Sequence, residues 1–98
     1  MKSIGFHPAA RVDAVESARY YEAKQTGLGK RFSIALQDEL SHIQNHPQLY
    51  PRIEGSCQRT LLRHFPYGVI FRERKDEIQI IAVMHLRRSP DSWKNRLE

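Results

Sequence analysis

The segment Ile78–His85, with the sequence IQIIAVMH, is apolar at nearly every position, and this restricts the folds open to the chain. A half-exposed strand alternates polar and apolar residues, whereas a nearly continuous apolar strand is typical of the centre of a sheet covered on both faces. The run is far shorter than the roughly 20 residues of a membrane-spanning helix. We therefore predict a central strand over Glu77–Leu86.

Three further segments have the residue pattern of strands. Gln58–Arg63 and Tyr67–Arg74 are separated by a break at Phe65 and Pro66, and the charged turn RKDE separates the second from the central strand. Met1–His7 alternates as a short strand that ends at Pro8. Between Met1–His7 and Gln58–Arg63 lie two helical patterns and a loop rich in proline and glycine.

The helical patterns predict an antiparallel hairpin. The first runs from Pro8 to Lys24, and the second ends before Pro47. Gly27 and Gly29 allow a tight reversal between them. The apolar face of the first helix is predicted to contain Val12, Val15, Ala18 and Tyr21 or Tyr20, and that of the second Phe32, Ala35, Leu36, Leu40 and Ile43.

The predicted order is strand, helix, helix, strand, strand, strand. A short closing helix over Pro90–Arg96, capped by Ser89, is a further expectation. A helical hairpin on one face of a mostly antiparallel sheet buries both apolar stripes most simply, so the predicted class is α+β. We expect residues 1–98 to form a single domain, because this length supports one modest core.

The composition narrows the possible partners and cofactors. Sixteen Lys and Arg against eleven Asp and Glu give a formal charge of +5, which favours a polyanion or an acidic protein as partner. Cys57 is the only cysteine, and His42 and His46 have the spacing of a zinc helix without a third ligand, so no metal or cofactor is expected. Without a signal-peptide pattern or a membrane span, we expect a soluble, cytoplasmic protein.

Strand alternation predicts a basic sheet face. Tyr67, Val69 and Phe71 form one side of their strand and are expected to face the helices, so the arginines that alternate with them fall on the other side. The same alternation places two basic residues on one side of each neighbouring strand. We expect six side chains to converge on this uncovered face: Arg59, Arg63, Arg72, Arg74, His85 and Arg87.

Several stretches, in this order and spacing, resemble the RelE/ParE toxin superfamily of bacterial type II toxin–antitoxin systems. They are YYE, GLGKRF, HPQLYPR, RTLLRHFPYGVIFRE and DEIQIIAVMHLRRSPDSW. The resemblance covers nearly the whole chain. It implies a plasmid-stabilisation type of toxin that inhibits growth and is neutralised by a small cognate antitoxin, whose acidic amphipathic segment could fold onto the toxin. It does not indicate an oligomeric state.

The superfamily divides into mRNA endonucleases that resemble RelE and gyrase poisons that resemble ParE, so the target is either ribosome-bound mRNA or DNA gyrase. Metal-independent RNA cleavage needs a proton acceptor, a proton donor and cations at the phosphate. In the nuclease reading, His85 is the acid or base, and Arg63 and Arg87 hold the phosphate.

Two differences from the nuclease members favour the ParE-like, non-nucleolytic branch. Nuclease members typically carry an arginine after the tyrosine that opens the middle strand, but Gly68 follows Tyr67 here. They also carry a C-terminal aromatic that stacks on a base, and the nearest candidate, Trp93, is favoured as an anchor of the C-terminal segment. A non-toxic nucleic-acid-binding module is a third reading. The residues predicted to bind the target or the antitoxin are Arg59, Arg63, Arg72, Arg74, Arg87, Arg88 and Trp93.

Overall fold

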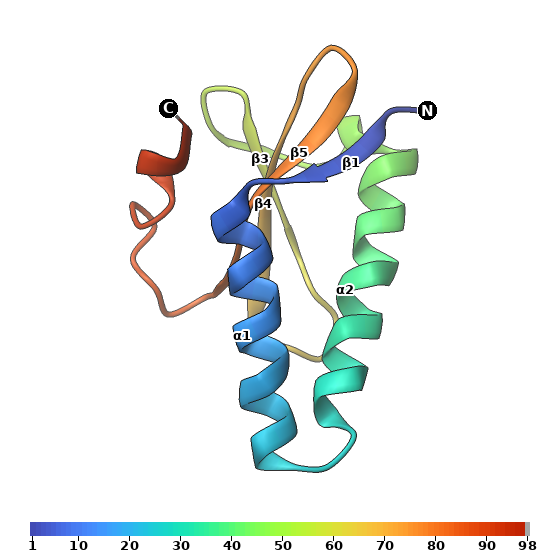
Figure 1. Cartoon of the computed structure of the whole chain (residues 1–98). Helices are drawn as coiled ribbons and strands as arrows, with labels where there is room; N and C mark the ends of the chain where they lie inside the picture. Colours follow the sequence, from blue (N-terminus) through green and yellow to red (C-terminus); the bar gives the residue numbers. More distant parts are fainter. Residues whose placement is uncertain (98) are drawn as a thin grey trace.

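The structure, a computed structural model, describes residues 1–97. A two-helix hairpin packs against a five-stranded sheet, and the C-terminal segment lies outside the hairpin, on the α1 side of the view (Figure 1). This confirms the predicted α+β class. The elements in chain order are β1 (Ser3–Phe6), α1 (Pro8–Lys24), α2 (Leu28–Asn45), the 3-10 turn η1 (Pro47–Leu49), β2 (Arg52–Glu54), β3 (Cys57–Leu61), β4 (Tyr67–Glu73), β5 (Glu77–His85) and the 3-10 turn η2 (Lys94–Leu97).

The strand order is β1-β5-β4-β3-β2, so the apolar strand β5 lies inside the sheet. β1 runs parallel to β5, and the other pairs are antiparallel, which makes the sheet mixed. The parallel pairing follows because the whole hairpin intervenes between β1 and the strands after it. β2 was not predicted; it is a three-residue edge strand within the proline-rich loop and pairs with β3.

The main core lies between the hairpin and the sheet. Tyr67, Val69 and Phe71 of β4 face the helices as predicted. The predicted face of α2 is also buried apart from Ala35, which is only partly covered. The residues that form this core are Ala10, Phe32, Leu36, Leu40, Ile43, Leu62, Tyr67, Val69, Phe71, Ile78, Ile80 and Val83.

The predicted inner face of helix α1 is confirmed for Ala18 and Tyr21 and wrong for the two valines. Val12 and Val15 are 53% and 46% exposed, while Ala10 is buried and Ala18 packs against the core. The two helices approach closely, since a Cβ added at Gly29 would lie 2.5 Å from the carbonyl oxygen of Ala18. Such a contact admits only small residues, so the alanine side of α1 packs inward and the valines face solvent.

A β-bulge in β5 changes which side chains face the helices. Ile70 pairs with Ala82, but its neighbour Phe71 pairs with Ile80, which leaves Ile81 as the extra residue. A shift of one residue exchanges the two faces of a strand. Beyond the bulge, therefore, His85 faces the helices, where simple alternation from Ile80 would place it on the opposite side.

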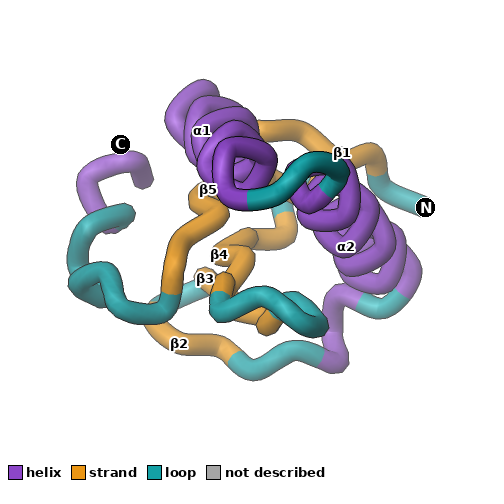
Figure 2. Tube along the Cα trace, turned by 90° about the horizontal axis from the view of Figure 1, so that it is seen from below, coloured by secondary structure: helices purple, strands orange, loops and turns teal. Residues whose placement is uncertain are grey.

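The face opposite the hairpin is partly covered, whereas an open face was predicted; Arg59 and Leu61 of β3 remain exposed. Residues 86–97 lie along it (Figure 2), and Trp93 is only 4% exposed. The expectation that Trp93 anchors this segment is confirmed. Its indole belongs to a second core with residues from β3, β4 and β5 and with Leu97; the buried strand residues are Cys57, Ile70, Ile81, Ala82 and Met84.

The closing helix predicted over Pro90–Arg96 does not form as such. The chain makes turns up to Trp93 and then the single 3-10 turn η2. Ser89 therefore caps no helix there; its Oγ accepts the backbone N–H of Asp91 at 3.3 Å within a turn. A helix of so few residues does not recover the cost of its first turn, so contacts of Trp93 and its neighbours determine the path.

We expect Phe32→Ala to lower the free energy of unfolding by about 3–5 kcal/mol, because Phe32 is fully buried between α2 and the sheet. Val12→Ala should change it by less than about 0.5 kcal/mol, although the sequence pattern assigns Val12 to the core. Urea unfolding monitored by circular dichroism measures both values. A loss above about 1.5 kcal/mol for Val12→Ala would contradict the orientation of α1.

Candidate functional site

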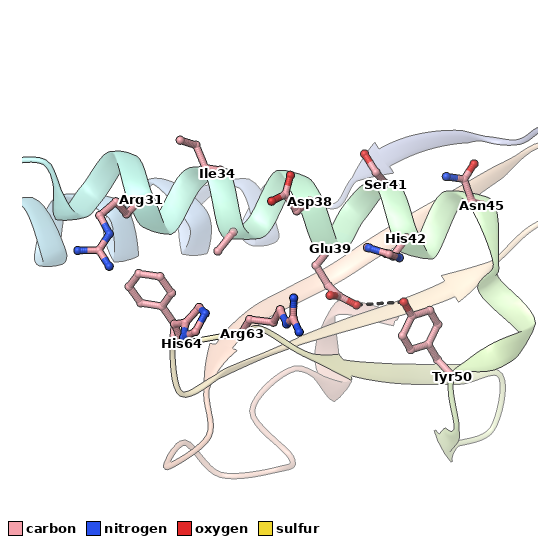
Figure 3. Close-up of a pocket in the computed structure, with 12 residues that line it drawn as sticks. Arg31, Ile34, Asp38, Glu39, Ser41, His42, Asn45, Tyr50, Arg63 and His64 are labelled. Atoms are coloured by element: carbon pink, nitrogen blue, oxygen red, sulfur yellow. Dashed lines mark hydrogen bonds between the residues drawn. The ribbon is translucent and has the colours of Figure 1, made fainter.

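A groove of about 840 Å³ runs along one flank of α2, opposite the connection between β3 and β4 (Figure 3). Its floor and walls combine charged, aromatic and aliphatic groups. Among residues 1–97 the lining consists of Arg31, Ile34, Ala35, Asp38, Glu39, Ser41, His42, Asn45, Tyr50, Arg63, His64 and Phe65.

Glu39 is the polar centre of the groove. Its carboxylate accepts the hydroxyl of Tyr50 at 3.0 Å and the hydroxyl of Thr60 at 2.5 Å. Burial, with the hydrogen bond to Glu39 as the second cause, raises the pKa of Tyr50 to about 12. Tyr50 therefore remains a neutral donor and ties the segment after α2 to the helix.

The opposite wall of the groove is held in a fixed, strained turn. His64 has a φ of 67°, in the left-handed region that residues other than glycine seldom adopt. Phe65 follows it, and its ring packs edge-to-face against Phe32 and Tyr21, with centroid distances of 5.2 and 4.9 Å. Because this packing maintains the conformation, Arg63 and His64 are presented at the groove with little freedom.

The groove places two arginines beside exposed apolar surface, and the carboxylates of Asp38 and Glu39 line it as well. Arg31 from α2 and Arg63 from the β3–β4 connection lie at its walls, and Figure 3 shows Arg63 directed toward the α2 side. Ile34 is 50% exposed within it. Sequence reasoning missed this site except for Arg63; the one available signal was Ile34, an apolar residue outside the buried face of its helix.

Arg63 does not share a face with Arg59, contrary to the prediction. β3 ends at Leu61, and Leu62 turns into the main core, where its N–H donates to the carbonyl of Tyr67 at 2.9 Å. Alternation holds through Leu62, and the turn that follows, in which His64 has a φ of 67°, brings Arg63 into the α2 groove on the helix side.

His85 also lies on the helix side, contrary to the prediction. Its ring packs against Tyr67 at a centroid distance of 5.3 Å, and its Nδ1 accepts the backbone N–H of Arg87 at 3.1 Å. Neither His85 nor Arg87 lines the groove that contains Arg63. The three residues of the nuclease hypothesis are thus not gathered around one cavity.

The remaining predicted cations fall into two places. Arg59 and Arg72 lie on the sheet face opposite the helices, since they pair with Ile70 and Cys57 of the second core. Arg72 and Arg74 both donate to Oε1 of Gln79, at 2.9 and 3.3 Å. The second place is the exposed turn after β5, which carries Arg87 and Arg88.

Arg59 partly fills the space above Gly68. A Cβ built on Gly68 would lie 3.4 Å from Cδ of Arg59, so the aliphatic stem of the arginine crosses the glycine. The position at which nuclease members carry an arginine after the tyrosine is therefore covered by an arginine from the neighbouring strand.

Residues 1–97 contain no group of three His, Cys, Asp or Glu side chains arranged to hold a metal ion. In the same part of the chain, neither helix combines the length and the apolar character needed to cross a membrane.

We expect Tyr50→Phe to lower the free energy of unfolding by about 1–2 kcal/mol at neutral pH, because Glu39 loses a hydrogen bond. The raised pKa means that Tyr50 stabilises the fold below its unfolded value of about 10 and loses this contribution as the pH rises through about 12. Urea unfolding between pH 9 and pH 11.5 should therefore decline more steeply for the wild type than for the variant. Parallel declines would contradict the proposed hydrogen bond.

Comparisons with known proteins identify the family to which this chain belongs. The model of the family described as the ParE toxin of the type II toxin–antitoxin system parDE matches residues 4–90. Among the matching solved structures is a chain of the chromosomal ParDE toxin–antitoxin system from P. aeruginosa, with a TM-score of 0.63 and 20% identity over 87% of this chain and 96% of that chain. No curated protein sequence matches. The structural likeness supports the fold, and the family match shows that this chain belongs to the ParE toxin family of type II toxin–antitoxin systems.

Proposed function

We propose that this toxin inhibits growth by a non-nucleolytic route, poisoning of DNA gyrase being the leading candidate, and that a cognate antitoxin neutralises it. Membership of the ParE family supports both parts. The observation that favours this route over RNA cleavage is that His85 does not line the groove that contains Arg63.

General acid–base cleavage requires the proton donor, the proton acceptor and the cations to meet at one phosphate. The Nδ1 of His85 is occupied by the N–H of Arg87, and its ring lies against Tyr67 under the helical hairpin. Arg63 points into the α2 groove, which His85 does not line. A single phosphate would not meet all three groups in this arrangement.

The aromatic residue nearest to the position expected in a nuclease is buried. Trp93 is buried in the second core, so its ring is not free to stack on a base. Gly68 supplies no cation, and the stem of Arg59 lies across it. These two positions favour the ParE-like branch.

The α2 groove suits an antitoxin segment. A chain with a formal charge of +5 attracts an acidic partner, and Arg31 and Arg63 lie beside the exposed Ile34. Of the two carboxylates in the same groove, that of Glu39 already accepts the hydroxyls of Tyr50 and Thr60. A disordered, acidic, amphipathic segment could fold into such a groove by placing apolar anchors near Ile34 and carboxylates near the arginines.

Controlled expression distinguishes the two toxin mechanisms. We expect growth arrest with an SOS response and uncut mRNA by primer extension, and inhibition of supercoiling when the purified toxin is added to gyrase. His85→Ala should retain the growth arrest, because the imidazole transfers no proton. Codon-dependent cuts that disappear in His85→Ala would instead establish the nuclease mechanism.

The adjacent reading frame is expected to encode a short protein with a DNA-binding half and an acidic amphipathic tail. Ile34→Asp should weaken binding of this protein at least ~10-fold by isothermal titration calorimetry, because it places a carboxylate in the apolar part of the groove. Val12→Asp is the matched control, since Val12 is similarly exposed on α1 and outside the groove. Equal affinities for Ile34→Asp and the wild type would remove the groove from the antitoxin interface.

A further inference from the structure

Residues Leu86–Leu97, here called the C-terminal strap, cover the sheet without joining it. Within residues 1–97, the strap forms no strand, and its backbone hydrogen bonds run to itself or to His85, apart from the N–H of Leu86, which donates to the carbonyl of Pro66 at 2.9 Å. After Leu86 the strap is therefore attached by side chains.

The first attachment is apolar. Trp93 and Leu97 pack on Ile70, Ile81 and Met84, and this second core is smaller than the one under the helices. The free energy gained by covering apolar surface scales with its area, so this attachment is weaker than the packing of the hairpin.

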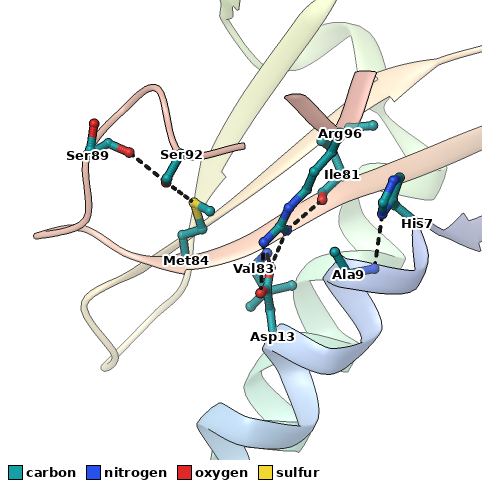
Figure 4. Close-up of polar contacts among 9 residues, drawn as sticks. All are labelled: His7, Ala9, Asp13, Ile81, Val83, Met84, Ser89, Ser92 and Arg96. Carbon is teal, nitrogen blue, oxygen red and sulfur yellow. Dashed lines mark hydrogen bonds and ion pairs between the residues drawn. The ribbon is translucent and has the colours of Figure 1, made fainter. Parts of the chain in front are cut away.

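The second attachment is a bidentate ion pair between the ends of the chain. Arg96 donates through Nη1 to Oδ2 of Asp13 at 2.6 Å and through Nη2 to Oδ1 at 3.2 Å (Figure 4). The two side chains are only 14% and 10% exposed. Such shielding from water makes the pair more consequential than a surface ion pair, and loss of one partner leaves a buried charge.

This ion pair also supplies hydrogen-bond partners to backbone groups of β5 that pair with no strand on that side. β1 pairs with β5 only as far as Ile80, so the next backbone groups of β5 need other partners. Oδ2 of Asp13 accepts the N–H of Val83 at 3.0 Å, and Nη1 of Arg96 donates to the carbonyl of Ile81 at 3.1 Å. Release of the strap would remove Arg96 from the Asp13 carboxylate and from the carbonyl of Ile81, while Asp13 would remain beside β5 because it belongs to α1.

We propose that the C-terminal strap is a lid that opens as a unit while the sheet and the helical hairpin remain folded, and that the Asp13–Arg96 pair is its latch. Segments with few tertiary contacts open at lower free energy than the whole domain. Opening exposes the apolar floor formed by Ile70, Ile81 and Met84. This proposal concerns the isolated chain and does not depend on the target of the toxin.

Cys57 provides the probe, because it is the only cysteine, is 1% exposed and belongs to the same buried cluster as Trp93. Burial also raises the pKa of its thiol, which slows labelling in the closed form. The experiment measures labelling of the full chain by a disulfide reagent across a urea series, beside global unfolding by circular dichroism. In the wild type we expect labelling through an opening that depends weakly on urea and occurs more often than global unfolding.

Two variants test the latch. Arg96→Gln and Asp13→Asn should each accelerate labelling in the absence of urea by roughly tenfold or more, and the double variant should add little to the single ones, because both remove one interaction. Lys94→Gln is the matched control in the same strap. Its partners Glu54 and Asp91 are exposed, so the labelling rate should change less than about twofold.

Labelling that follows global unfolding in both rate and urea dependence would overturn the proposal, as would equal acceleration by Lys94→Gln. If the latch variants fail to fold, hydrogen exchange of the wild type tests whether the strap opens separately from the sheet. The amides of Ser92 and Arg96 should exchange through a smaller opening free energy than that of Val69 in the central sheet. Exchange of all three through one common transition would show that the strap does not open separately.

Discussion

Burial of β5 on both faces is the constraint on which the rest of the structure depends. Ile78, Ile80 and Val83 face the helical hairpin, whereas Ile81, Ala82 and Met84 face the other side. A strand of this kind leaves no face that water can cover at low cost. The chain must supply two covering layers, and it does so with the hairpin on one side and the C-terminal strap on the other.

The bulge at Ile81 determines what the surface of the sheet can do. It brings His85 to Tyr67 under the hairpin and so separates the histidine from the arginines on the opposite face. Arg63 is displaced for a different reason, because β3 ends at Leu61 and the turn through His64 brings Arg63 to the α2 groove. The positive charge is thus distributed between the α2 groove, the strap side of the sheet and the turn after β5. The predicted single basic face is replaced by three separate basic regions.

The two covering layers are held by different means. The hairpin contributes large buried side chains from α2 and small ones from α1, which let the helices approach each other closely. The strap contributes one tryptophan, one leucine and the arginine that reaches Asp13, together with an exposed Lys94–Glu54 ion pair and a contact of Ser92 with Met84. Because its attachments are few, the strap is the part of the fold in which local motion and stability can be separated from the remainder.

The sequence by itself determined the order of the main elements, the limits of α1, the end of α2 and the facing of β4, because these follow from local signals: Pro8, Gly27, Pro47 and the alternation from Tyr67 to Phe71. Only the tertiary structure decided that α1 turns its alanines inward, that β5 carries a bulge and that Arg63 faces α2. These features depend on how closely distant segments approach and on which backbone groups remain unpaired. Periodicity along one segment contains neither kind of information, so the groove and the Asp13–Arg96 pair emerge only when the layers are packed together.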